Sequence, residues 1–389
     1  MDDIVIVGGG IIGSCTAFHL AAAGVGEHVR VIEPDPTYQH AATPKSSGGV
    51  RIQFALSDNV QMSQYGHQFY REFGQRMAIG EEAPDVGLIN RGYLYLAGTP
   101  NSAAMLERNL QVQEACGAKV ELLDQTNLRD RFPLINVEDV VVGAHSPDDV
   151  IIDPHSALMG VRRKAIHDGV TYVNDRVVEF ERVHTRVHTV RLESGEVLRA
   201  EWFVNAANCW APELSAAIGM PVPVVPLPRN TFYYECADQL ASMPLTRHLE
   251  VPGSFRPEGR GFITGYTPSH ASAGFNWEID YPIFEELLWP NLAKRVTAFE
   301  RSKLKSAWAC HYDQNTLDGN LILGNWPGQL DNYIIACGLS GHGLQHAPAI
   351  GRAVAEFIVQ GRYQSLDLSA FGYQRVVDER PLNDPGPHA

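Results

Sequence analysis

The chain has 389 residues and a formal net charge of −14 at pH 7. A chain of this length is longer than a single hydrophobic core usually accommodates, so we expect two domains, or one large domain with an insertion. An acidic chain is a poor partner for nucleic acid or an anionic membrane surface, because both bind basic faces. We therefore expect small-molecule chemistry and no nucleic-acid partner.

The cysteines and the N-terminus bear on the compartment. Six cysteines are scattered without a CxxC pair, which is typical of a reducing, cytoplasmic setting. The first residues carry acids where a secretory signal has basic residues. The apolar stretch 4–24 approaches the length of a transmembrane helix, but its clustered glycines and internal histidine favour a buried strand and helix. We predict a cytoplasmic protein with no transmembrane segment.

The N-terminal region predicts a right-handed βαβ unit, with a strand at 3–8, a helix at 11–24 and a second strand in VRVIEP. A helix is expected between about 57 and 80. Further strands are expected at 92–98, 119–124, 139–145, 176–193 and 198–205, with a helix from Pro154 to about His167. Residues 224–267 are strand-rich, and a helix near 282–293 and strands near 306–313 and 332–337 follow.

The first turn carries a dinucleotide motif. Gly8, Gly10 and Gly13 form GxGxxG directly after the strand, and Glu33 ends the second strand. These glycines allow a tight turn, close approach of a pyrophosphate and close helix–strand packing, at the positive end of the helix. Glu33 would accept hydrogen bonds from the adenosine ribose and would repel a ribose phosphate, which disfavours the phosphorylated nicotinamide cofactor.

Two later segments favour FAD over NAD. Residues 204–214 enter a helix from a strand end, and residues 338–348 form a second glycine-rich turn before a helix. The N-terminus of the second helix would suit the pyrimidine side of a reduced, anionic isoalloxazine, whereas a nicotinamide needs no such site.

The chain resembles the D-amino-acid oxidase and sarcosine oxidase superfamily of FAD flavoproteins. The resemblance rests on VIVGGGIIGSCTAFHLAAAG, SSGGVR, IIDPHSAL, VNAANCWAPEL and YIIACGLSGHGLQHAPAIGRAVAEFI. The segments LWPNLAKRVTAFE, AWACHYDQNTLDGN and GHGLQHAPAIGRAVAEF are most similar to the FAD-dependent oxidoreductase domain-containing family, which includes an assembly protein of mitochondrial respiratory complex I.

The resemblance implies an α/β fold. It consists of a discontinuous Rossmann-like FAD-binding domain of the glutathione-reductase type and an inserted α+β substrate domain with a mixed antiparallel sheet. The implied FAD-binding segments are 1–82, 146–222 and 306–375. The substrate segments are 83–145 and 223–305, and residues 376–389 are expected to form a flexible tail, because they lack apolar periodicity.

The implied cofactor contacts are spread over the whole chain. Val177 would meet adenine, Arg51 would lie near the flavin ring, and Asn208 stands where the family has glycine. The implied set is Gly8, Gly10, Ile11, Ile12, Gly13, Glu33, Ser46, Ser47, Gly49, Arg51, Val177, Ala207, Trp210, Cys310, Tyr312, Gly341, His342, Gly343, Leu344 and Gln345. No metal site is predicted.

The implied reaction is oxidation of a secondary or tertiary amine, an N-substituted amino acid or imino acid, by hydride transfer to flavin N5. Water then hydrolyses the imine. Arg51, His342 and Tyr266 are the expected catalytic residues, although Arg51 could serve a structural ion pair and His342 could hold its turn. Expected substrate-binding residues are Tyr234, Arg256, Tyr266 and Gln345, although aromatic residues in sheets are most often core.

Two departures from the sarcosine oxidase pattern are informative. Ile263 stands where those enzymes place an oxygen-activating lysine, so an electron acceptor other than O₂ is expected, such as a protein or a quinone. Gln345 and Phe54 replace two cationic anchors of the substrate carboxylate. Arg229, Arg256 and Arg260 are the candidate replacements, with solvated loop charges as the alternative.

Cys310 and Tyr312 match the spacing at which monomeric sarcosine oxidases bond a cysteine sulfur to the flavin 8-methyl carbon. The most similar family has glycine at position 310, and a buried thiol is the alternative.

Two other functions are retained: a 2-hydroxy-acid dehydrogenase, which would need a basic histidine near flavin N5, and an assembly factor that binds FAD without turnover.

Overall fold

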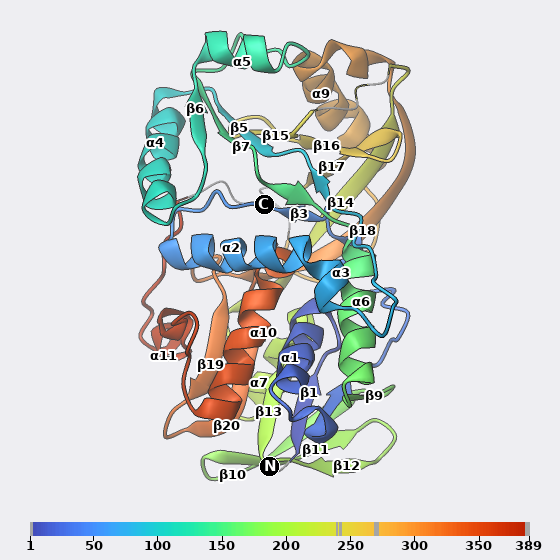
Figure 1. Ribbon diagram of the computed structural model, residues 1–389, viewed down its shortest axis with the longest axis vertical. Helices are drawn as coiled ribbons and strands as arrows, with labels where there is room; N and C mark the ends of the chain where they lie inside the picture. Colours follow the sequence, from blue (N-terminus) through green and yellow to red (C-terminus); the bar gives the residue numbers. More distant parts are fainter. Residues whose placement is uncertain (1–2, 239, 241–242, 268–271, 386–389) are drawn as a thin grey trace.

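The computed structural model describes residues 3–238, 240, 243–267 and 272–385 (Figure 1). A six-stranded sheet has the order β19-β20-β13-β1-β2-β9. Its strands are β1 (Ile4–Val7), β2 (Val29–Ile32), β9 (Thr171–Val173), β13 (Trp202–Asn205), β19 (Ile322–Trp326) and β20 (Leu330–Cys337). All neighbouring pairs are parallel except β19 with β20. Three distant parts of the chain thus form the predicted nucleotide-type sheet.

Both faces of this sheet are covered. Ile4 and Ile6 pack toward helices α1 (Ile11–Ala22), α6 (Pro154–His167) and α10 (Gly343–Gln360), with α2 (Ser57–Arg71) crossing above them in Figure 1. Val5 and Val7 point the other way, because alternate strand residues face opposite sides. That side holds α7 (Ala211–Ala217) and the three-stranded sheet of β10 (Val177–Val183), β11 (Arg186–Leu192) and β12 (Val197–Arg199).

A second, eight-stranded sheet has the order β18-β14-β17-β16-β15-β5-β7-β6 and lies above α2 in Figure 1. Its strands are β5 (Tyr93–Ala97), β6 (Glu121–Leu123), β7 (Val142–Ser146), β14 (Val224–Glu235), β15 (Leu245–His248), β16 (Ser254–Glu258), β17 (Gly261–Tyr266) and β18 (Lys303–Asn315). Strands β15 and β5 are parallel and the other pairs antiparallel, which gives the predicted mixed sheet. The expected boundary at residue 306 falls inside β18.

Short elements join these layers. Strands β3 (Gly49–Val50), β8 (Val150–Ile151) and β4 (Ile89–Asn90) form a small sheet beside α2. The remaining α-helices of the described residues are α3 (Phe73–Arg76), α4 (Pro100–Ala115), α5 (Gln125–Arg131), α8 (Tyr281–Ile283), α9 (Trp289–Arg295) and α11 (Gln374–Val377). Within the described part of the chain, no helix is long and apolar enough to cross a bilayer.

Helix α4 is absent from the elements that the sequence predicts. Its buried positions are Ala103, Leu106, Asn109 and Gln113, and the last two are polar. Gln113 Nε2 donates to the carbonyl of Phe54 at 3.0 Å. Because half of the buried face is polar, the apolar period that marks an amphipathic helix is missing.

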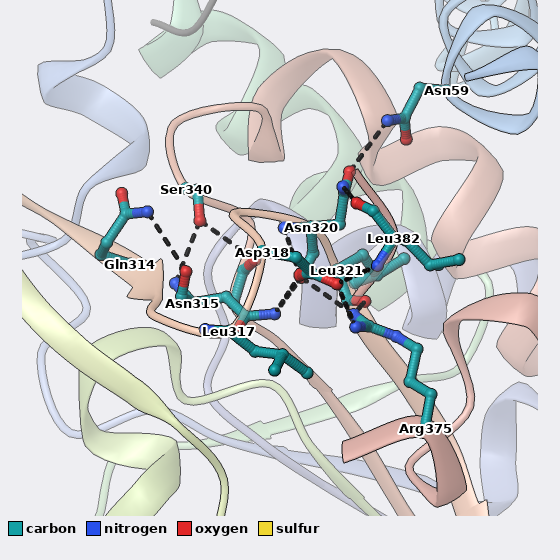
Figure 2. A network of polar contacts seen from close by, with 11 residues as sticks. Asn59, Gln314, Asn315, Leu317, Asp318, Asn320, Leu321, Ser340, Arg375 and Leu382 are labelled. Atoms are coloured by element: carbon teal, nitrogen blue, oxygen red, sulfur yellow. Dashed lines mark hydrogen bonds and ion pairs between the residues drawn. The ribbon is translucent and has the colours of Figure 1, made fainter. Parts of the chain in front are cut away.

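A buried polar network supports the end of β18 and the loop before α10 (Figure 2). Arg375 forms an ion pair with Asp318, and both side chains are buried. Asn315 Nδ2 donates to the other oxygen of Asp318 at 2.9 Å, and Asn315 N donates to Ser340 Oγ at 3.0 Å. The network ties the C-terminal segment to the loop that precedes α10.

The same network corrects the expectation of a flexible tail. Leu382 N donates to Asp318 at 2.7 Å, and the carboxylate of Asp384 accepts from Ala55 N at 2.8 Å and Asn59 Nδ2 at 2.7 Å. Leu382 and Asp384 therefore have fixed partners although the segment lacks apolar periodicity, because polar groups provide the attachment. Residues 386–389 lie outside the described residues.

Candidate functional site

A cavity of about 480 Å³ lies where the carboxyl ends of β1 and β2 approach one face of the eight-stranded sheet. Its lining includes Gly8 and Glu33 from the nucleotide side and Arg229 and Tyr312 from the other sheet. Ligands of open α/β sheets bind at this edge, outside the carboxyl ends of parallel strands.

The glycine turn has the geometry that its motif predicts. Gly8 has φ +96°, and a Cβ there would lie 2.6 Å from the carbonyl oxygen of Ala206. A Cβ on Gly13 would lie 1.9 Å from the oxygen of Gly8, so helix and strand are in close contact. At Gly10 the nearest atom to a Cβ is Thr43 Oγ1 at 3.9 Å, so this position faces open cavity. The turn therefore leaves room for a pyrophosphate at the N-terminus of α1.

Glu33 anchors the same turn. Its Oε2 accepts from Gly9 N at 2.8 Å, and its Oε1 accepts from Asp35 N at 3.0 Å. Burial raises the pKa of Glu33, and these two backbone hydrogen bonds oppose that shift. Each carboxylate oxygen has a second lone pair, so Glu33 can hold the turn and also accept from a ribose hydroxyl.

Three further residues predicted near adenosine or the flavin, Val177, Ala207 and Trp210, line the cavity, as do Ile11 and Ile12. Asn208, which stands where the resemblance implies a glycine, has φ +52°, in the left-handed region that favours glycine. Asparagine tolerates this conformation better than most residues with a Cβ. The turn is therefore retained despite the substitution.

The predicted flavin loops also meet at the cavity. Ser46, Ser47 and Gly49 line it from the chain before α2. Residues Gly341, His342, Gly343, Leu344 and Gln345 line it from the N-terminal end of α10. Asp313 on β18 fixes the second loop, because its Oδ2 accepts from Gly338 N at 2.7 Å and Leu339 N at 3.1 Å. Burial raises the pKa of Asp313 to about 6, against these hydrogen bonds.

Arg51 and His342 form a buried pair in the cavity wall. Arg51 Nη2 lies 3.2 Å from His342 Nε2. A guanidinium has no acceptor, so Nε2 accepts this hydrogen bond and the imidazole is neutral, with its proton on Nδ1. Arg51 also donates to the carbonyl of Gln53, and its backbone N donates to Gln345 Oε1 at 2.9 Å. These contacts orient both side chains from distant segments of the chain.

Cys310 and Tyr312 lie side by side along one face of β18 and line the cavity, as their alternate spacing predicts. Cys310 is 3% exposed, and burial raises the pKa of its thiol, whereas Arg229 and Lys45 lower it. His311 also lines the cavity together with Cys310 and Tyr312, although consecutive residues of a strand normally point to opposite faces. Its Nε2 accepts from Asn276 N at 2.8 Å.

Three of the expected substrate and catalytic residues lie elsewhere. Arg229 and Thr231 of β14 line the cavity, whereas Tyr234, at the opposite parity, packs in the core beneath the sheet. Tyr266 pairs with Asn230 and therefore shares that core face. Neither tyrosine is among the described residues that line the cavity.

Arg256 is the third expected site residue that lies away from the cavity lining. It is 4% exposed, forms an ion pair with Glu258 and donates to Pro257 O at 2.9 Å, and it does not line the cavity as described. Arg260 is exposed on the turn between β16 and β17. Of the three candidate carboxylate anchors, the structure brings Arg229 to the site.

Several lining residues were not predicted. Tyr93 and Tyr95 of β5, Arg247 of β15 and Lys45 before the flavin loop line the cavity. Arg247 lies opposite Tyr95 in the parallel β15-β5 pair. For the three strand residues, the only signal in the sequence was the strand alternation, which does not say which face meets the cavity. Lys45 lies in the short helix Thr43–Lys45 and had no such signal.

Together the glycine turn, the two flavin loops and the wall of the second sheet define a flavoprotein oxidoreductase. The chain belongs to the DAO family of FAD-dependent oxidoreductases, whose model matches residues 3–357. FAD-dependent oxidoreductase domain-containing protein 1 of Xenopus laevis is 34% identical over 420 residues, which cover 98% of this chain and 83% of that protein.

Other relatives are more distant. Mitochondrial sarcosine dehydrogenase of Mus musculus is 25% identical over 388 residues, which cover 96% of this chain and 41% of that protein. Among solved structures, L-proline dehydrogenase from P. horikoshii superposes with a TM-score of 0.88 at 23% identity, covering 98% of this chain and 99% of that one. Glycine oxidase from Geobacillus kaustophilus superposes with a TM-score of 0.82 at 21% identity, covering 96% of this chain and 98% of that one. These two structures bear on the fold alone.

Proposed function

We propose that this protein oxidises a secondary or tertiary amine, an N-substituted amino acid or imino acid, to an imine that water hydrolyses. The carbon–hydrogen bond next to nitrogen breaks with departure of hydride, and the nitrogen lone pair forms the C=N bond. Water then adds to release a carbonyl compound and the remaining amine. The names of two relatives, sarcosine dehydrogenase and 4-methylaminobutanoate oxidase (formaldehyde-forming), describe amine substrates and support this class.

The cofactor fits the cavity that the described residues form. Bound FAD supplies the hydride acceptor. The turn at Gly8 and Gly10 would hold its pyrophosphate, Glu33 and Val177 its adenosine, and the loop 341–345 its flavin ring. The side chains of Arg51 and Tyr312, which both line the cavity, would then face the substrate.

The protonation state of His342 favours an amine over a 2-hydroxy acid as the substrate class. Oxidation of an alcohol requires a base that takes the hydroxyl proton, whereas an amine uses its own lone pair to expel hydride. The Nε2 lone pair of His342 already accepts from Arg51, and Nε2 of His311 accepts from Asn276. His342 and His311 are therefore engaged at the nitrogen that a base would use, which favours the amine. The third histidine of the described lining, His40, packs edge-on against Trp277.

We further propose an electron acceptor other than O₂, either a protein or a quinone. Ile263 is buried on β17 and does not line the cavity as described. Lys45 is the lysine of the described lining, so Lys45→Met tests whether a cation at another position activates oxygen. We expect slow reoxidation by O₂ and fast reoxidation by a soluble quinone in both wild type and variant. Fast reoxidation by O₂ that Lys45→Met abolishes would contradict this proposal.

The reaction class is tested by anaerobic mixing of the flavin-loaded protein with sarcosine, N-methylglutamate, proline and lactate. We expect the flavin absorbance at 450 nm to bleach with one or more amines and not with the hydroxy acid. Bleaching by hydroxy acids alone would support a 2-hydroxy-acid dehydrogenase. No bleaching by any compound would favour an FAD-binding assembly factor without turnover. Arg51→Met is expected to lower the reduction rate by about 100-fold while flavin stays bound.

A further inference from the structure

The segment 51–55 forms no helix or strand and is held by side chains from elsewhere in the chain. The backbone N of Ile52 donates to Asp149 Oδ1 at 3.1 Å. The carbonyl of Phe54 accepts from Gln113 Nε2 at 3.0 Å. Buried backbone polar groups need partners, so these side chains supply the hydrogen bonds that a helix or strand would otherwise provide.

A third side chain that holds this segment comes from the C-terminal part of the chain. The buried carboxylate of Asp384 accepts from Ala55 N at 2.8 Å and from Asn59 Nδ2 at 2.7 Å. Leu382, two residues earlier, accepts through its carbonyl from Asn320 Nδ2 at 2.6 Å (Figure 2). Hydrogen bonds to a carboxylate are stronger than those between neutral groups. Asp384 therefore links the C-terminal segment firmly to the residues that precede and begin α2.

The neighbour of Ala55 in sequence, Phe54, packs against two residues of the cavity lining. The centre of its ring lies 3.8 Å from Cζ of Arg51, which is the geometry of a cation–π contact. The same ring lies edge to face with the imidazole of His342, with 5.1 Å between the ring centres. A shift of Ala55 would move this ring, and with it a surface on which Arg51 and His342 pack.

We propose that Asp384 is a positioning residue of the flavin site, which fixes Ala55 and thereby holds Phe54 against Arg51 and His342. The inference rests on the proposed function, in which Arg51 lies at the flavin ring, and goes beyond it by giving the C-terminal segment a part in the site. A positive charge fixed beside a flavin stabilises its reduced, anionic form. The position of Arg51 therefore affects the reduction potential of bound flavin as well as the rate of its reduction.

The reduction potential tests this role without any substrate. Loss of a negative charge alone would raise the potential, whereas withdrawal of Arg51 from the flavin would lower it. We expect Asp384→Ala to lower the potential, titrated against a reference dye, and Arg51→Met to lower it more. In the Arg51→Met background, Asp384→Ala should lower it no further. A raised potential in Asp384→Ala, or an equal fall in both backgrounds, would overturn the proposal.

Two further variants separate positioning from general support of the fold. Asp384→Asn keeps an acceptor for Ala55 N and removes the charge, so its potential should be at or above that of wild type. Asn109→Ala removes another attachment of the segment, the hydrogen bond from Asn109 Nδ2 to Pro385 O at 3.3 Å, and should keep the wild-type potential. Loss of FAD from Asp384→Ala would show a structural anchor instead and would also overturn the proposal.

Anaerobic reduction by an amine gives a second, kinetic test. At saturating amine we expect Asp384→Ala to lower the reduction rate by about tenfold, and by less than about twofold in the Arg51→Met background. Equal losses in the two backgrounds would contradict an action through Arg51. If no amine reduces the wild type, the proposed amine oxidation fails, while the reduction potentials still decide the role of Asp384.

Discussion

The two ends of the cavity are built in different ways. At the end proposed to hold the nucleotide, the wall is a turn of glycines, Gly8, Gly10 and Gly13, which offers backbone amides and no side chains. At the end proposed to hold the substrate, the wall is made of side chains from strands of another sheet, among them Arg229, Arg247 and Tyr95. Backbone recognition tolerates little change but is common to many cofactor proteins, whereas side chains on a rigid sheet can be exchanged to suit a substrate.

The largest expected effect comes from the glycine turn. Gly13→Ala would place a Cβ 1.9 Å from the oxygen of Gly8, and we expect protein that is insoluble or contains no flavin. Gly10→Ala has no such clash, because its φ is −63° and its nearest neighbour to a Cβ lies at 3.9 Å.

Apoprotein of Gly10→Ala should melt at the wild-type temperature but bind FAD at least about tenfold more weakly, measured by fluorescence quenching. If both variants bound FAD as wild type does, the backbone account of this end would be wrong.

A second effect concerns the support of the α10 loop by Asp313. Asp313→Ala removes the acceptor for two buried amides, so we expect a loss of about 2–4 kcal/mol in the free energy of unfolding and weaker FAD binding. Asp313→Asn keeps an oxygen for both amides and removes the charge.

The pH dependence of Asp313 has a defined sign. Its folded pKa is about 6 and its ordinary value is 3.8. The stability that it contributes is therefore fully present below about pH 4 and is lost as the pH rises through 6. We expect the difference in melting temperature between wild type and Asp313→Asn to change between pH 4 and 6. A constant difference over that range would contradict the raised pKa.

A smaller effect separates the two faces of the eight-stranded sheet. Tyr95 lines the cavity beside Arg247, and we expect Tyr95→Phe to lower kcat/KM by about tenfold through one lost hydrogen bond to substrate. The hydroxyl of Tyr234 is buried, with no hydrogen-bond partner among the described residues. Tyr234→Phe should therefore keep its kcat/KM and melt at or above the wild-type temperature. Loss of activity in Tyr234→Phe alone would show that the wrong face was assigned to substrate.

The smallest effect is expected at Cys310. The thiolate is the form that would attack a flavin carbon, and burial raises the pKa of this thiol. We therefore expect acid precipitation to release FAD into the supernatant. A yellow precipitate that turns colourless in Cys310→Ala would establish a covalent bond instead.

Much of the cofactor end was predictable because its signals are local. The motif at Gly8 to Gly13 and the turn at Gly341 to Leu344 are contiguous in sequence, and each lies between a strand and a helix. Attachment of residues 376–385 was not predictable, since it depends on buried polar pairs such as Arg375 with Asp318.

The sequence by itself determined the glycine turn after β1, the α/β class and the position of Cys310 on a strand. Only the tertiary structure decided which face of each strand lines the cavity. A strand alternates its side chains with a period of two, so Arg229 and Tyr234 in one strand face opposite sides. That Arg51, Arg229 and Arg247 line one cavity likewise depends on pairing between segments far apart in the chain, which no local pattern encodes.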